Sequence, residues 1–124
     1  MSKVLIIEDQ EEIRENLSEL LEISDFDVIT AVNGQNGLQQ IQSELPDIIL
    51  CDISMPVMDG YEVLKQVRNN VQTKKTPFVF ISASAQDADI MAGKIAGADA
   101  YLTKPFSLQK LINTIELLVV KQPH

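Results

Sequence analysis

The fold of this chain can be worked out from residues 48–60, which read Ile48-Ile49-Leu50-Cys51-Asp52-Ile53-Ser54-Met55-Pro56-Val57-Met58-Asp59-Gly60. The first four residues form a short apolar run, which is typical of a fully buried strand. The run stops at a single carboxylate, Asp52, and turn-forming residues follow it. Open α/β sheets bind ligands just outside the carboxyl ends of their strands, so Asp52 is the candidate reactive group. The alternative is that Asp52 only caps the turn that follows it.

Size and composition indicate one ordinary globular domain over residues 1–124, with 45% hydrophobic and 23% charged residues. The formal net charge of −8 repels phosphate backbones and anionic membrane surfaces, so we expect no direct nucleic acid or membrane binding. The apolar runs are too short to span a bilayer, and no signal-peptide cleavage site follows the first residues. We therefore expect a cytoplasmic protein. The one cysteine, Cys51, lies inside the apolar run and is interpreted as a small core residue.

Strand-like and helix-like segments alternate five times along the chain. Strands are predicted at residues 4–7, 26–30, 47–51, 77–81 and 100–102, and a segment with helical spacing of apolar residues follows each of them. Such alternation indicates a parallel sheet with right-handed crossovers and helices on both faces. The first, third and fourth strands are apolar throughout and belong in the centre, whereas the second and fifth belong at the edges. We predict an α/β, three-layer, flavodoxin-like (βα)5 domain with strand order 2-1-3-4-5.

Two of the predicted helices have features that bear on their ends or their packing. The helix near residues 87–95 consists mostly of small residues, so it should bury little area and be held loosely. Gly97 is well placed to end it. The last helix is expected to begin after Ser107 as its N-cap.

Three carboxylates should meet at one edge of the predicted sheet. The first and third strands are neighbours in this order, so Glu8, Asp9 and Asp52 converge at their carboxyl ends. Crowded carboxylates repel one another unless a cation lies among them, and hard oxygen ligands favour Mg²⁺. The alternative is that Glu8 and Asp9 only complement the positive end of the first helix.

Two further strand ends supply a hydroxyl and a positive charge to the same edge. Ser82 follows the fourth strand and Lys104 follows the fifth. A transferring phosphoryl group spreads its charge over three oxygens, and each oxygen needs a cation or a hydrogen-bond donor. With these groups around it, Asp52 would attack a phosphoryl donor and form an acyl phosphate. Taken singly, Ser82 is more often a turn former and Lys104 a solvated lysine.

The pattern of these residues resembles the receiver domain of two-component response regulators, over essentially the whole chain. The residues that carry the resemblance are Glu8-Asp9, Asp52, Met55-Pro56-x-x-Asp59-Gly60, Ser82-Ala83 and residues 97–106, which read GADAYLTKPF. The resemblance implies that Asp52 is the phosphoacceptor and that Asp9 binds Mg²⁺ directly, with Mn²⁺ as a substitute. It also implies that Glu8 acts through a metal-bound water. Asp52 and the Ser54 backbone carbonyl would complete the protein ligands.

The same resemblance assigns roles to the other strand ends. Ser82 and Lys104 would hold the phosphoryl oxygens, Gly60 would be structural, and the Lys104-Pro105 bond would be cis. On phosphorylation Ser82 would move toward the new oxygens, and the Tyr101 ring would turn into the vacated space. The alternative is that Tyr101 is a static aromatic residue of the edge strand. Glu8 stands where many relatives carry an aspartate, and its longer arm could alter metal affinity.

The implied function is a signalling phosphoacceptor, not a turnover enzyme, with self-catalysed phosphorylation and dephosphorylation of Asp52. Its partners would be a sensor histidine kinase or histidine phosphotransfer protein, which would dock near the first helix, and a downstream effector. A phosphorylation-dependent homodimer is a further expectation. Residues 119–124 show no effector, and the sequence leaves open whether this is a stand-alone regulator or a receiver from a hybrid kinase or multidomain regulator.

Two other protein classes share parts of the pattern. Haloacid-dehalogenase-like phosphatases also use a strand-end aspartate, Mg²⁺, a hydroxyl and a lysine, but they carry a second aspartate where this chain has Ser54. Flavodoxins share the predicted architecture. The acidic loop at residues 8–12 would repel the phosphate of a flavin cofactor.

Overall fold

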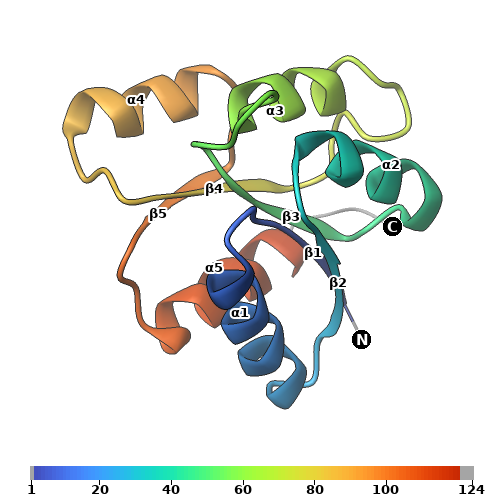
Figure 1. Cartoon of the computed structure of the whole chain (residues 1–124), viewed down its shortest axis with the longest axis vertical. Coiled ribbons are helices and arrows are strands. Elements are labelled where there is room, and N and C mark those ends of the chain that lie inside the picture. The colour runs from blue at the N-terminus through green and yellow to red at the C-terminus, as the bar shows by residue number, and fades with distance from the viewer. Residues whose placement is uncertain (1, 121–124) are drawn as a thin grey trace.

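The computed structural model describes residues 2–120 and contains a five-stranded parallel sheet between two layers of helices (Figure 1). The strands are β1 (Lys3–Ile7), β2 (Asp27–Ala31), β3 (Ile48–Asp52), β4 (Phe78–Ser82) and β5 (Ala100–Thr103). The helices are α1 (Glu11–Ile23), α2 (Gly34–Glu44), α3 (Gly60–Arg68), α4 (Asp87–Ile95) and α5 (Leu108–Val120). The sheet has the order β2-β1-β3-β4-β5, which confirms the predicted fold and its edge strands.

Alternate residues of the central strands enter two separate cores. In β3, Ile48 and Leu50 pack into the core that also contains residues of α1 and α5. Ile49 and Cys51 pack into the opposite core, which contains residues of α2 and α3. Figure 1 shows α1 and α5 on one face of the sheet and α2, α3 and α4 on the other. Both faces of β1, β3 and β4 are therefore buried, as their continuous apolar sequences require.

Several strands end one residue later than the sequence predicted. β3 includes Asp52, β4 includes Ser82, and β5 includes Thr103. The reason is register: Asp52 pairs with Ile81, and Ser82 pairs with Thr103, so the hydrogen-bonded ladder extends beyond the apolar runs. The polar residues of the predicted site therefore lie partly on the strands themselves, where the ladder holds their backbone.

Polar side chains cap the N-terminal ends of α2, α3 and α5. The Asn36 N–H donates to Asn33 Oδ1 at 2.7 Å, and the Glu62 N–H donates to Asp59 Oδ1 at 3.0 Å. The Lys110 N–H donates to Ser107 Oγ at 3.1 Å, which confirms the predicted cap of the last helix. Caps of this kind satisfy backbone donors that have no partner within the helix.

α4 buries little of its side-chain surface, as the sequence predicted. Its one buried residue is Gly93, whereas Met91 and Ile95 are 59% and 78% exposed. Gly97 follows the helix with a φ of 110°, a conformation that favours glycine, and this confirms its predicted place at the helix end.

Within residues 2–120, none of the helices has the length and hydrophobicity of a membrane span. The expectation that residues 119–124 contain no effector segment falls in part on residues 121–124, which lie outside the described residues.

Candidate functional site

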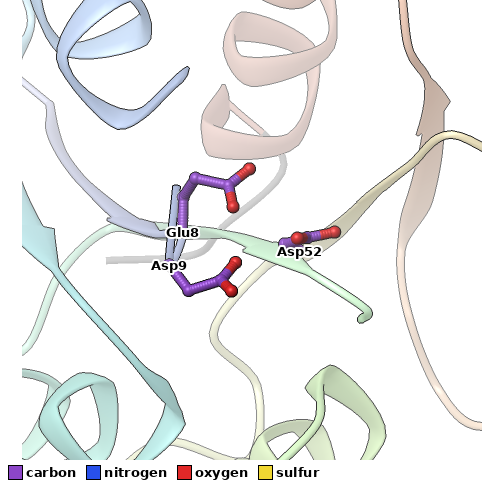
Figure 2. Close-up of side chains that lie close together, drawn as sticks. All are labelled: Glu8, Asp9 and Asp52. Carbon is purple, nitrogen blue, oxygen red and sulfur yellow. The ribbon is translucent and has the colours of Figure 1, made fainter. Parts of the chain in front are cut away.

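Three acidic residues lie together where β1 and β3 end (Figure 2). Ile7 pairs with Cys51 in the sheet, so the next residues of the two strands, Glu8 and Asp52, are also side by side. Glu8, Asp9 and Asp52 each offer a carboxylate oxygen within 4.8 Å of the others. The topology therefore brings together the three acids that the sequence singled out.

Glu8 is a buried carboxylate with a partner on each oxygen. Its side chain is 3% exposed, and Oε1 accepts a hydrogen bond from Lys104 Nζ at 3.0 Å. Oε2 accepts from the Gln10 N–H at 3.2 Å. A buried carboxylate is tolerated only where it is paired and hydrogen-bonded, and Lys104 supplies most of that compensation.

Asp9 differs from Glu8 because part of its carboxylate has no partner. Its Oδ1 is buried and makes no hydrogen bond within the described residues. Burial raises the pKa of Asp9 above its ordinary value, and the adjacent Glu8 side chain raises it further. A buried oxygen without a donor, beside two more carboxylates, fits a hard divalent cation such as Mg²⁺. Glu8, Asp9 and Asp52 together could hold such an ion.

Lys104 and Ser82 lie at the ends of the next two strands. The Lys104 N–H donates to the Ser82 carbonyl at 2.7 Å, which ties the end of β5 to the end of β4. Lys104 Nζ lies 3.9 Å from Asp52 Oδ1, and the Lys104-Pro105 peptide bond is cis. Ser82 Oγ accepts a hydrogen bond from the Ser84 N–H at 3.1 Å. One ammonium group thus lies within reach of two carboxylates, and one hydroxyl lies on the neighbouring strand.

The loop after Asp52 places the remaining predicted residues. The Gly60 N–H donates to the Ile53 carbonyl at 2.9 Å, so the start of α3 lies against the end of β3. A Cβ on Gly60 would lie 2.6 Å from the Asp52 carbonyl oxygen, and therefore only glycine fits without displacement. Ser54 is exposed in this loop.

Tyr101 lies on the outermost strand but points inward, over the core. Its hydroxyl donates to the Ser84 carbonyl at 3.0 Å. A Cβ on Gly93 would lie 3.0 Å from Tyr101 Cδ2, so the ring packs directly beneath α4. The ring already lies between α4 and the sheet in this structure, and its movement on phosphorylation stays a prediction.

Cys51, next to Asp52, packs in the core with residues of α2 and α3, and its thiol donates to the Asp52 carbonyl at 3.3 Å. The residue is fully buried, and burial together with the Asp52 charge raises the pKa of its thiol well above 9.0. A protonated, inaccessible thiol is unreactive, which confirms the interpretation as a small core residue.

Sequence reasoning missed two contacts in this region. One is the Glu8–Lys104 ion pair, which joins residues 96 positions apart. The other is the bond from Ser84 Oγ to Asp89 Oδ2 at 2.5 Å, which joins the β4 loop to α4. Lone Ser, Asp, Glu and Lys residues on a surface are so common that no local signal indicated either pairing.

Comparisons with known proteins agree on one family. The family described as response regulator receiver domain matches residues 4–116. The chain is similar to protein PilG of Pseudomonas aeruginosa, with 40% identity over 92% of this chain and 84% of PilG. It is 34% identical to the response regulator ArlR of Staphylococcus saprophyticus, over 99% of this chain and 54% of ArlR. It is 41% identical to the alkaline phosphatase synthesis transcriptional regulatory protein PhoP of Bacillus subtilis, over 85% of this chain and 43% of PhoP.

The chain thus spans about half the length of ArlR and PhoP. Among solved structures, it is similar to the chemotaxis response regulator CheY4 of Vibrio cholerae, with a TM-score of 0.89, 35% identity and coverage of 95% of this chain and 98% of that one. The receiver domain of the Francisella response regulator 1452 gives a TM-score of 0.91 at 32% identity, over 98% of both chains.

Proposed function

The chain belongs to the receiver-domain family of two-component response regulators, a family of signalling domains, and from that membership we propose that it accepts a phosphoryl group on Asp52. The observation that carries this proposal is the meeting of Glu8, Asp9 and Asp52 at one sheet edge, with Lys104 beside them. The donor would be a phosphorylated histidine on a sensor kinase or phosphotransfer protein. The proposed domain is the whole of residues 1–124, and the proposed location is the cytoplasm.

In the proposed reaction, an Asp52 carboxylate oxygen attacks the phosphorus atom of the donor. The new P–O bond forms as the bond from phosphorus to the donor breaks, and the donor leaves with the bonding electron pair. With phosphohistidine the leaving group is the imidazole, and with acetyl phosphate it is acetate. The product is an acyl phosphate on Asp52, so the chain itself supplies the nucleophile.

Asp9 and Asp52, with the Ser54 carbonyl and with Glu8 acting through water, would hold the Mg²⁺ ion. When bound, the ion supplies positive charge that offsets both the crowded carboxylates and the charge of the phosphoryl oxygens. The unpartnered Asp9 Oδ1 supports this assignment. Mn²⁺ has the same preference for oxygen ligands and is the expected substitute.

Lys104 and Ser82 are proposed to hold the phosphoryl oxygens. Lys104 Nζ lies 3.0 Å from Glu8 Oε1 and 3.9 Å from Asp52 Oδ1. A small movement of the Lys104 side chain would therefore carry its ammonium group from Glu8 to a phosphoryl group on Asp52. Ser82 Oγ would donate its proton to a second phosphoryl oxygen. These two donors would stabilise the charge that develops during transfer.

The output of this chemistry would be a change in the surface around Tyr101, with Ser82 and Tyr101 as the switch residues. We propose that downstream effectors bind this surface, and that it also forms a homodimer when Asp52 is phosphorylated. Asp52 phosphorylation and its hydrolysis would be self-catalysed events of a signal, not steady turnover of a substrate.

The test is incubation of the full chain with acetyl phosphate and Mg²⁺, followed by intact-mass measurement. One phosphoryl group should add to the wild-type protein and none to Asp52→Asn, and omission of Mg²⁺ should reduce the labelling strongly. Asp59→Asn, which keeps the cap of α3 but changes an acid outside the cluster, is the matched control and should still be labelled. Labelling of Asp52→Asn, or no labelling of the wild type, would refute the proposal.

A further inference from the structure

Ser84 is a hydrogen-bonding centre that joins three elements of the switch region. Its N–H donates to Ser82 Oγ at 3.1 Å, on the last residue of β4. Its carbonyl accepts from the Tyr101 hydroxyl at 3.0 Å, on β5. Its hydroxyl donates to Asp89 Oδ2 at 2.5 Å, in the first turn of α4. Each polar group of this one residue therefore contacts a different element.

The contact with Asp89 matters because little else holds the start of α4. Gln86, the N-cap residue of α4, makes no side-chain cap, and Ser84 Oγ holds the residue before the helix by accepting from the Gln86 N–H at 3.3 Å. Gly93 is the one buried residue of α4, so side-chain burial contributes little to holding the helix. The Ser84–Asp89 pair, which we name the α4 latch, is therefore the main polar attachment of the first turn.

The other end of α4 is attached much more firmly. Arg68 at the end of α3 donates to the Gly97 carbonyl from Nε at 3.3 Å and from Nη2 at 3.0 Å. Nη2 also forms an ion pair with Asp99 at 3.0 Å, and that carboxylate accepts from the Phe78 N–H at 2.8 Å. The helix thus has a fixed C-terminal end and an N-terminal end that depends on the α4 latch.

We propose that Ser84 is a positioning residue that couples the Ser82 hydroxyl to the first turn of α4 through the α4 latch. The inference rests on the proposed function, because it is phosphorylation of Asp52 that would draw Ser82 Oγ away. When that hydroxyl turns toward a phosphoryl oxygen, the Ser84 N–H loses its acceptor and the Ser84 backbone shifts. The latch to Asp89 then weakens, and α4 moves at its free end while Arg68 retains the other.

The coupling can be measured in the unliganded protein, without metal or phosphodonor. Amide hydrogen exchange over residues 84–97 of the full chain reports the opening of α4. Removal of the latch by Ser84→Ala or by Asp89→Ala should speed exchange of the first turn about fivefold, the effect expected for one hydrogen bond. Asp87→Ala is the matched control, because Asp87 carries the same charge in the same turn but its side chain forms no hydrogen bond or ion pair among residues 2–120.

Ser82→Ala tests the link from Ser82 to the latch. Without the acceptor for the Ser84 N–H, exchange of the first turn should rise in the wild-type background and not in the Asp89→Ala background, where the latch is already absent. An equal rise in both backgrounds, or exchange in Asp89→Ala no faster than in Asp87→Ala, would overturn the inference. Asp89 is exposed, so the variant that decides the outcome should fold normally.

A second arm adds Mg²⁺ and beryllium fluoride, which imitates a phosphoryl group on a carboxylate. The change in α4 exchange that these additions cause in the wild type should shrink at least threefold in Asp89→Ala, and an undiminished change would contradict the latch. The first arm needs no phosphoryl group. If Asp52 takes up no phosphoryl group, only the second arm loses its effect, whereas if the latch does not exist, the exchange rates of the first arm do not change either.

Discussion

Val57 lies in the loop between Asp52 and α3 with a backbone φ of 70°, and its side chain is fully exposed. A β-branched residue in this left-handed conformation is strained, because its Cβ approaches the backbone too closely. The side chain buries nothing that would offset the strain. Valine is therefore poorly suited to the backbone conformation at this position.

We predict that Val57→Gly stabilises the protein by about 0.5–1 kcal/mol, the relief of strain less the greater entropy of glycine in the unfolded chain. Urea denaturation followed by circular dichroism would measure the change. Val71→Gly is the control, because Val71 is also highly exposed but lies in a turn without a positive φ. It should lower the free energy of unfolding, and a loss of stability in Val57→Gly as well would contradict the prediction.

Glycines allow helices and strands in this molecule to approach each other closely. A Cβ on Gly60 would lie 2.6 Å from the Asp52 carbonyl oxygen, whereas a Cβ on Gly37 would lie 2.5 Å from Ile7 Cδ1. The two clashes differ in kind. At Gly37 the Cβ would meet side-chain atoms of the buried Ile7, Cδ1 at 2.5 Å and Cγ1 at 2.9 Å, which can shift only within the core. The Asp52 carbonyl is part of the central ladder and is held in place.

We therefore expect Gly60→Ala to destabilise the protein by about 2–4 kcal/mol and Gly37→Ala by at most about 2 kcal/mol. Alanine also favours the interior of a helix, which offsets part of the cost at Gly37. Thermal unfolding of the two variants would rank them. A Gly60→Ala variant as stable as the wild type would show that α3 can move away from β3 at no cost.

The stability of the whole molecule should depend on pH and Mg²⁺ through Asp9. Its pKa is raised in the folded state, so the folded protein binds this proton more tightly than the unfolded chain does. The corresponding stability is present below the ordinary pKa of 3.8 and is lost as the pH rises through the raised value. At neutral pH the ionised Asp9 therefore destabilises the metal-free protein.

Asp9→Asn should accordingly raise the thermal midpoint of the metal-free protein at neutral pH by a few degrees and remove its response to Mg²⁺. In the wild type, Mg²⁺ at ten times its Kd should add about 1.4 kcal/mol of stability, and the gain should decrease as the pH falls and protons compete for Asp9. Differential scanning fluorimetry at several pH values would follow both effects. If Asp9→Asn gained as much stability from Mg²⁺ as the wild type does, the ion would bind elsewhere. Asp87→Asn removes the same charge outside the cluster and serves as the control.

Much of this architecture could be predicted from local patterns, because buried strands and amphipathic helices each have a characteristic spacing of apolar residues. The apolar runs around Leu5, Leu50 and Val79 indicated the three central strands, and their order follows from the connection rules for parallel sheets. Once that order was known, the strand ends predicted that Glu8, Asp9 and Asp52 would meet. The exact strand ends were off by one residue because ladder pairing does not depend on hydrophobicity.

The partners of individual polar side chains could not be read in the same way. Glu8 pairs with Lys104, Ser84 with Asp89, and Arg68 with Gly97 and Asp99. These residues are distant in sequence or lie on exposed turns, and each could equally have faced water. Periodic burial is repeated over many residues and so leaves a signal in the chain, whereas a single ion pair or hydrogen bond depends on the final positions of two elements and exists only in the folded molecule.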